Sequence, residues 1–236
     1  MTKDFFHIAI DGPVAAGKGT VSKLIAHRLG FLYVDTGAMY RVTAYLAHQN
    51  KVAYDDEQKI VELLESSKMK MRTPDENEQD GRLITVFLDG EDISWKIRTE
   101  EISQGSSKVS VLSEVRKILV KKQQEIAYGQ DVVMEGRDIG SRVLPEADLK
   151  IFLTANVRER AERRLLQLQL KGLDLDIQEV LREIEERDTR DMNRQTDPLK
   201  MMPDSWKLDA TDLTIEQVVE KIVDKVNEMR ANSTKK

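Results

Sequence analysis

The stretch IAIDGPVAAGKGT, residues 8–20, decides the fold of this chain. The apolar run at 5–10 has the length and composition of a buried parallel strand and stops at Asp-Gly-Pro. Gly12, Gly17 and Lys18 then have the spacing of a phosphate-binding loop, and a helical pattern follows. In such a loop, backbone N–H groups and the helix N-terminus bind phosphate oxygens, and the lysine adds a full charge. We therefore predict a nucleotide phosphate site between a strand and a helix.

Gly19 stands where the strict phosphate-loop pattern has Ser or Thr. The hydroxyl that helps to hold Mg²⁺ follows one residue later, at Thr20, so we expect Thr20 to contribute to an Mg²⁺ site. The sequence GKGT is the variant found in nucleoside monophosphate kinases. We expect the phosphates of ATP to be bound by Gly12, Pro13, Val14, Ala15, Ala16, Gly17, Lys18, Gly19 and Thr20.

Composition and charge exclude several classes of function. The 236 residues carry 37 Lys and Arg against 42 Asp and Glu, and this net charge of −5 argues against nucleic acid or a membrane surface as partner. The absence of Cys excludes disulfides, thiol catalysis and Cys-ligated zinc, and three dispersed His argue against a His-based metal site. Residues 1–10 lack the long apolar stretch of a signal peptide, and no run approaches the ~20 apolar residues of a membrane span. We expect a cytoplasmic protein.

The rest of the chain alternates short apolar strands with helical segments, which favours a parallel sheet with helices on both faces. Further strands are predicted at 31–34, 131–135, 149–155 and 205–210, and helices at 35–50, 99–108, 113–127, 156–172, 176–194 and from 214 onward. Residues 68–95 differ, because two strand-like runs flank the turn-rich TPDENEQDG. This pattern predicts a small antiparallel hairpin insert.

The side chains beyond the loop indicate the kind of phosphoryl acceptor. A hydroxyl acceptor benefits from a base, whereas a phosphate monoester is already largely ionised near neutral pH. A monophosphate kinase instead needs positive charge that holds two polyanions together. The chain offers such charge after strand ends and along one face of a helix, at Arg41, Arg137 with Asp138, and Arg187, Arg190, Asp191 and Arg194.

The helix predicted at 176–194 buries little of its length. Its apolar stripe ends at Ile184, whereas its basic face continues for another ten residues, and we interpret this segment as part of a mobile lid. The alternative is an ordinary solvated helix in which charges pair at i,i+4. For Arg160, Arg163 and Arg164 on the preceding helix, the structural interpretation is favoured, because nearby leucines already explain that helix.

Five motifs, taken together, resemble the bacterial cytidylate kinase family in order and spacing: DGPVAAGKGT, DTGAMYR, EDIS…IRTEEISQGSSKVS…VR, MEGRDIG and ERDTRDMNR. The resemblance covers nearly the whole chain. It implies an α/β fold with a P-loop NTPase core, in which helices flank a five-stranded parallel sheet. It also implies an antiparallel hairpin insert in a monophosphate-binding region, and a helical lid over ATP. One kinase domain, 1–236, would comprise a core (about 1–40, 128–155 and 195–236), the monophosphate-binding region (about 41–127) and the lid (about 156–194).

The resemblance also implies the reaction and the residues that perform it. The γ-phosphoryl group of ATP, with Mg²⁺, would pass to CMP or dCMP, giving CDP or dCDP and ADP, in pyrimidine nucleotide metabolism. The catalytic residues would be Lys18, Arg137, Arg190 and Arg194. CMP would be bound by Thr36, Tyr40, Arg41, Ser107, Arg116, Arg137, Asp138, Arg187, Asp191 and Arg194. Ser107, Arg116 and Asp138 resemble residues that read the cytosine edge, and Glu135 would orient an Mg²⁺-bound water.

Two alternatives remain at the level of sequence. The first is a P-loop kinase for another monophosphate, UMP or AMP, or for a metabolite hydroxyl. The second is a nucleotide-dependent switch or motor, which should carry a base-selecting motif such as N-K-x-D, and the sequence contains none. We expect a monomer, because a lid and a moving acceptor region occupy much of the surface.

Overall fold

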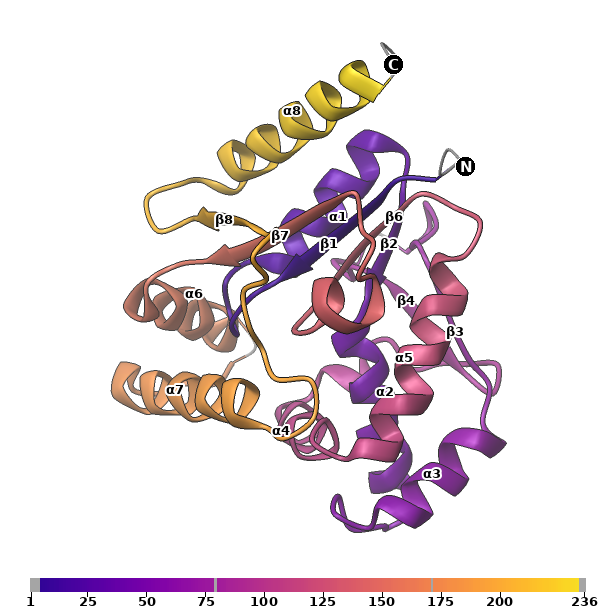
Figure 1. The fold of residues 1–236 in the computed structure, drawn as a ribbon. Helices are drawn as coiled ribbons and strands as arrows, with labels where there is room; N and C mark the ends of the chain where they lie inside the picture. The colour runs from indigo at the N-terminus through magenta and orange to yellow at the C-terminus, as the bar shows by residue number, and fades with distance from the viewer. Residues whose placement is uncertain (1–4, 79, 171, 234–236) are drawn as a thin grey trace.

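The computed structural model describes residues 5–78, 80–170 and 172–233. Its central element is a parallel sheet in the order β2-β6-β1-β7-β8 (Figure 1). The strands are β1 (His7–Asp11), β2 (Leu32–Asp35), β6 (Val132–Gly136), β7 (Leu149–Thr154) and β8 (Trp206–Asp209). Ile10 of β1 lies opposite Glu135 of β6 and Ile151 of β7. The prediction of a five-stranded parallel sheet is confirmed.

Helices cover both faces of this sheet. Side chains alternate along β1, so Ile8 and Ile10 pack with α1 and α8, whereas Ala9 packs with α5 and a π-helical turn. These elements are α1 (Lys18–Leu29), α5 (Ser113–Ala127), the π-helical turn η2 (Ile139–Val143) and α8 (Ile215–Ser233). Both faces are therefore buried, which explains why the strands read as continuous apolar runs.

A second sheet, the β insert, is antiparallel and has the order β3-β4-β5. It consists of β3 (Met69–Arg72), β4 (Thr85–Leu88) and β5 (Glu91–Asp92), and the predicted hairpin insert is confirmed. The flanking helices are α2 (Thr36–Gln49), α3 (Glu57–Ser66), the 3-10 helix Lys96–Arg98 and α4 (Glu100–Val109). The sequence analysis did not anticipate α3, in which Ile60 and Leu64 are buried and Asp56 caps the N-terminus.

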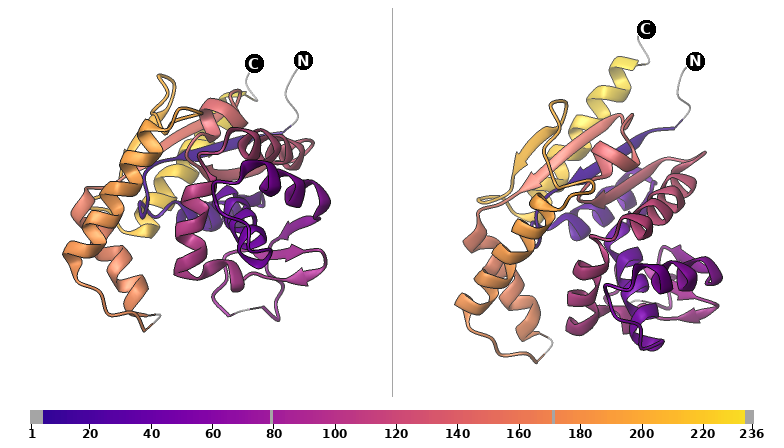
Figure 2. Two further views of the ribbon diagram at one scale, coloured as in Figure 1. Left: turned by 90° about the horizontal axis from the view of Figure 1, so that it is seen from below. Right: turned by 60° about the horizontal axis from the view of Figure 1, so that its bottom comes forward.

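Two further helices, α6 (Val157–Gln169) and α7 (Ile177–Asn193), form a hairpin at one side of the sheet (Figures 1 and 2). They pack on each other through their own small core, which contains Ala161, Leu168, Val180 and Ile184. Helix α6 ends at Gln169, three residues before the predicted end near Gly172, and Leu170 is its C-cap. We call this unit the α6–α7 hairpin.

Candidate active site

The site lies where the carboxyl ends of β1, β6 and β2 meet, as expected for an open α/β sheet. The phosphate loop after β1 has a special backbone. A Cβ on Gly12 would lie 2.0 Å from the carbonyl oxygen of Leu153, and φ is +156°, so a side chain is excluded there. Gly17, the N-cap of α1, is left-handed with φ 88°. The glycines therefore allow the loop to pass close to β7 and turn into the helix.

Lys18 is buried at the start of α1, and its Nζ donates to the Pro13 carbonyl oxygen at 2.8 Å. Burial and the neighbouring Arg137 lower its pKa to about 7, against the opposing influence of Glu135. An ammonium group in this position lacks a full counter-charge. The loop is therefore suited to a ligand that brings negative charge.

A phosphate pocket opens over this loop. It is bordered by seven of the nine predicted loop residues, but not by Gly12 and Pro13. The lining residues are Val14, Ala15, Ala16, Gly17, Lys18, Gly19, Thr20, Asp35, Gly37, Arg41, Leu83, Arg98, Glu135, Arg137, Arg164, Gln167 and Arg187. Five of these are arginines, so the pocket complements a polyanion.

A second pocket, the acceptor pocket, adjoins the first. Its lining residues are Thr36, Gly37, Tyr40, Arg41, Ser106, Ser107, Ser110, Glu135, Gly136, Arg137, Asp138, Arg187, Asp191 and Arg194. Gly37, Arg41, Glu135, Arg137 and Arg187 border both pockets. Ligands in the two pockets would therefore meet at three arginines and one carboxylate.

One of the shared arginines, Arg137, is held by a buried carboxylate. Arg137 Nε donates to Asp191 Oδ2 at 2.6 Å, which joins the end of β6 to α7. Although burial raises the pKa of Asp191, Arg137 and other arginines outweigh it and lower the value below its usual range. Burial and the nearby Arg98 lower the pKa of Arg41 to about 10. Asp191 is thus an ionised anchor for Arg137.

The far end of the acceptor pocket is organised around Asp138. Its carboxylate accepts hydrogen bonds from Arg116 Nη2 at 2.5 Å and from Arg194 Nη2 at 3.2 Å. Arg194 also donates to the carbonyl oxygen of Asp197. Arg116 does not border the pocket; it lies behind Asp138, over the ring of Tyr40 at 5.7 Å. Of the predicted base-reading residues, Ser107 and Asp138 therefore border the pocket, whereas Arg116 lies behind it and donates to Asp138 and to the Ser110 carbonyl oxygen.

The α6–α7 hairpin contacts α4 directly. Arg190 Nη1 donates to Ser107 Oγ at 2.5 Å, and Arg187 Nη1 lies 3.4 Å from Ser103 Oγ. Arg190 is exposed and borders neither of the two pockets, in contrast to the other predicted catalytic residues. Its contact instead joins the hairpin to a predicted base-reading serine.

Glu135 stands between the two pockets, and Tyr33 Oη donates to its Oε1 at 3.2 Å. Burial and then Asp35 raise its pKa. Among residues 5–78, 80–170 and 172–233, no group of three or more His, Asp or Glu could hold a metal ion. Thr20 and Glu135 nevertheless offer a hydroxyl and a carboxylate oxygen beside the phosphate pocket. This donor set fits Mg²⁺, which binds through one or two protein oxygens together with substrate phosphates.

Sequence analysis missed Asp188, which holds the phosphate loop. The Asp188 carboxylate accepts from the Val14 N–H at 3.1 Å and from Arg160 Nη1 at 2.6 Å. Asp188 follows Val180 and Ile184 on α7 at intervals of four residues, so it lies on the buried face of the helix. A carboxylate at this position of an apolar stripe is the sequence feature that could have indicated a buried partner.

The structure also places four arginines that the sequence did not assign to the site. Arg160 and Arg163 border neither of the two pockets, which agrees with the structural role expected for them. Arg164, in contrast, borders the phosphate pocket, and its guanidinium pairs with the Glu100 carboxylate at 2.6 Å. Arg98, which sequence analysis missed, borders the phosphate pocket and donates to Asp35 at 2.9 Å. Arg98 lies within the motif IRTEEISQGSSKVS and Arg164 within the basic cluster of residues 160–164, but nothing in either pattern separates the residue from its neighbours.

Comparisons with known proteins identify the relatives of this chain. The sequence model described as cytidylate kinase matches residues 8–228. A cytidylate kinase of Caldicellulosiruptor bescii is 49% identical over 92% of this chain and 94% of its own length. One of Lactobacillus gasseri is 45% identical over 95% of each chain. The crystal structure of an uncharacterized protein from Eubacterium ventriosum has a TM-score of 0.51 at 10% identity, covers 94% of this chain and 98% of its own, and supports the fold alone. Within the described part of the chain, no helix has the length and apolar character needed to cross a membrane.

Proposed function

The chain belongs to the cytidylate kinase family, and on this premise we propose that it transfers the γ-phosphoryl group of ATP to CMP or dCMP. The products are ADP and CDP or dCDP, in pyrimidine nucleotide metabolism. The observation that carries the proposal is the border shared by the phosphate and acceptor pockets, where Arg41, Arg137 and Arg187 face both. A donor phosphate and an acceptor phosphate bound there would both contact these arginines.

The phosphate loop, Gly12 to Thr20, binds the phosphates of ATP. Backbone N–H groups at the start of α1 point at the phosphate oxygens, and Lys18 provides a charge that follows the transferring group. The pKa of Lys18, lowered to about 7 by burial and by Arg137, supports this role, because phosphate oxygens would supply the counter-charge that the loop lacks.

The acceptor phosphate needs no general base, since its oxygen is already largely ionised near neutral pH. Catalysis then rests on position and charge. Arg137 and Arg194 hold the acceptor phosphate beside the phosphate pocket. Thr36, Tyr40 and Arg41 also line the site of this acceptor phosphate. Arg187 and Asp191 contact the ribose. The catalytic group comprises Lys18, Arg137, Arg190 and Arg194.

The base of the acceptor is read by Ser107, Arg116 and Asp138. The cytosine amino group donates to an oxygen of Asp138 or Ser107, and arginine donates to the ring nitrogen or carbonyl oxygen. Ser107 and Asp138 border the acceptor pocket and Arg116 pairs with Asp138 behind it, which supports this assignment. UMP, which has no amino group, would leave the buried carboxylate without that donor.

Thr20 and Glu135 would hold Mg²⁺, Glu135 through a bound water. When bound, Mg²⁺ offsets the negative charge that develops on the ATP phosphates. The chain's own contribution is the pair of oxygens that orient the ion and the buried arginines that bring the two phosphates together.

We also propose the three-part division of one kinase domain and its setting. The core spans about 1–40, 128–155 and 195–236, the monophosphate-binding region about 41–127 and the lid about 156–194. The separate core of the α6–α7 hairpin supports a lid that moves as a unit. The protein acts as a cytoplasmic monomer on small nucleotides, without nucleic acid or membrane partners.

Transfer can be tested directly with ATP labelled in the γ-phosphate. With Mg²⁺ and CMP, the label is expected in CDP at a rate that depends on CMP concentration. An R137A variant should bind ADP but form little labelled CDP. Label that appears only as inorganic phosphate, whatever the CMP concentration, would contradict the proposed function.

A further inference from the structure

The β insert reaches the phosphate pocket through one side chain, Leu83, which precedes β4. Leu83 borders the pocket, and a Cβ placed on Gly19 would lie 3.3 Å from Leu83 Cδ1. The same Cβ would lie 3.1 Å from Glu135 Oε1, so Gly19 leaves room for both neighbours. Leu83 is the largest aliphatic side chain among the residues that border this pocket. It therefore forms an apolar wall in a pocket otherwise rich in charge.

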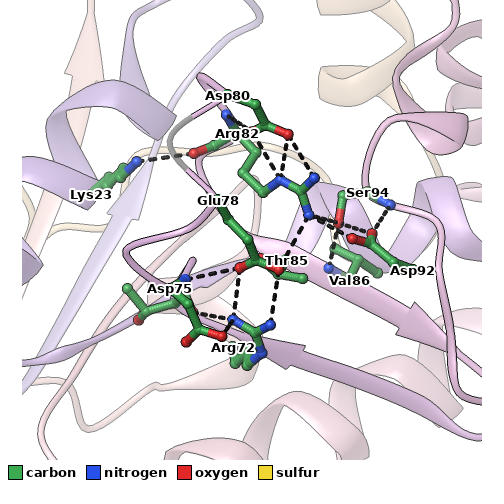
Figure 3. A network of polar contacts seen from close by, with 11 residues as sticks. Lys23, Arg72, Asp75, Glu78, Asp80, Arg82, Thr85, Val86, Asp92 and Ser94 are labelled. Atoms are coloured by element: carbon green, nitrogen blue, oxygen red, sulfur yellow. Dashed lines mark hydrogen bonds and ion pairs between the residues drawn. The ribbon is translucent and has the colours of Figure 1, made fainter.

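A network of ion pairs fixes the residue next to Leu83. The guanidinium of Arg82 pairs with Asp80 at 2.6 Å and with Asp92 at 2.6 Å, and its side chain is only 12% exposed (Figure 3). Asp92 in turn accepts from the backbone N–H of Ser94 at 2.9 Å. Isolated surface pairs contribute little, but several charges joined in one network around a mostly buried guanidinium hold a turn in one geometry. The position of Leu83 is thus set by charges that have no contact with the pocket.

A second bond ties the same residue to α1, the helix that follows the phosphate loop. Lys23 Nζ donates to the backbone carbonyl oxygen of Arg82 at 3.0 Å (Figure 3). Lys23 lies five residues after Lys18 and borders neither of the two pockets. This bond holds the end of the turn against α1, so Leu83 is fixed relative to the phosphate loop.

We propose that Leu83, positioned by Lys23 and the Arg82 network, excludes water from the γ-phosphate of ATP, an inference that rests on the proposed kinase function. Without this wall, the oxygen of a water molecule could bond to the γ-phosphorus while the bond from that phosphorus to the bridging oxygen of ADP breaks. The products would be ADP and inorganic phosphate, with the water's protons passing to solvent and phosphate. Leu83 is a positioning residue that favours transfer over hydrolysis.

The test compares ATP hydrolysis without a monophosphate with CMP-dependent ADP formation in the same preparation. L83A is expected to raise the ratio of hydrolysis to transfer roughly fivefold and to weaken ADP binding only slightly, because a small aliphatic contact is lost. The matched control is L63A, since Leu63 is, like Leu83, a partly buried leucine packed against the core, but it lies on α3 and does not border the phosphate pocket. L63A should keep the wild-type ratio even if its thermal midpoint falls.

Lys23 provides a second route to the same result, in case L83A does not fold. K23M should raise the ratio in the same direction, and K23R should restore it, because arginine can also donate to the Arg82 carbonyl. A wild-type ratio in both K23M and a folded L83A would overturn the inference. Hydrolysis without an acceptor and ADP binding are measured independently of CMP. If wild-type protein failed to phosphorylate CMP, the proposed function would fail, whereas the effect of L83A on hydrolysis could still be read.

Discussion

The guanidinium of Arg116 and the carboxylate of Asp138 form an ion pair of 2.5 Å in which the Arg116 side chain is 1% exposed. Arg116 belongs to α5, and Asp138 follows β6. Arg194, at the end of α7, donates to the second oxygen of the same carboxylate. One buried carboxylate therefore connects three parts of the chain at the far end of the acceptor pocket.

We expect D138N to impair base recognition more than phosphate binding. The amide keeps the size of the side chain but removes one acceptor and the charge, so kcat/KM for CMP should fall by about 10- to 100-fold. The KM for ATP should stay near the wild-type value, and the preference for CMP over UMP should shrink. Steady-state kinetics with both acceptors measure this. The control is D224N on the exposed surface of α8; an unchanged preference in D138N would argue against base reading by Asp138.

Much of the fold follows from local sequence, because each feature is encoded within a few residues. The glycine spacing around Lys18 requires a strand-loop-helix unit, and the turn-rich stretch before Leu83 predicts the insert. Helix α3 was not predicted, although its buried apolar residues have helical spacing. The polar segments on either side of it contain no strand pattern or motif that would mark where the helix begins and ends.

The residues of the candidate site likewise fall into those that local sequence predicts and those that only the folded structure brings together. Many of the residues that border the pockets lie in compact motifs, so they could be predicted from the sequence. Asp188 bonds to Val14 across 174 positions, and this partnership arises only when the α6–α7 hairpin packs beside the sheet. The same holds for Arg190, whose position near Ser107 depends on how the hairpin meets α4. Such contacts are set by tertiary packing and not by local pattern.

The buried pair of Asp188 and Arg160 should be important for stability. D188A leaves the buried Arg160 guanidinium without its carboxylate, so the free energy of unfolding should fall by about 3–5 kcal/mol. D188N should cost less, because its carbonyl oxygen can still accept from the Val14 N–H. The double variant D188L/R160M should recover part of the loss, since no unpaired charge remains. Urea denaturation of the four proteins checks this; a loss below about 1 kcal/mol in D188A would contradict it.

Arg190 should act through the closed arrangement of the α6–α7 hairpin. R190A is expected to lower kcat by about 100-fold while KM for CMP changes little, because the lost charge acts mainly on the transferring phosphoryl group. R182A on the same helix is the matched control, since Arg182 is also exposed and borders neither pocket.

Hydrogen exchange supplies an independent readout of lid closure. Amides of α7 should gain protection when ADP and CMP are both bound, and less with either alone. Equal protection of α7 with and without both ligands would rule out a moving lid.

Lys18 should make nucleotide binding depend on pH. Burial and Arg137 lower its pKa to about 7, and bound phosphates should raise it again, so one proton is taken up when the pH lies between the two values. Affinity for ADP should therefore fall as the pH rises above 7, by up to about tenfold per unit. Calorimetry at pH 8 in two buffers of different ionisation enthalpy measures the proton uptake. K18M should show none, and an uptake equal to wild type in K18M would assign the proton to another group.

The most direct test of the central claim is a coupled ADP-release assay with Mg·ATP and a panel of CMP, dCMP, UMP, AMP and GMP. Each acceptor is titrated so that kcat/KM values can be compared on the same enzyme preparation. We predict the highest kcat/KM with CMP and dCMP, because cytosine, unlike uracil, offers an amino donor to Asp138, and the pocket is assigned to a pyrimidine. Turnover led by AMP or UMP would contradict the assignment of the acceptor.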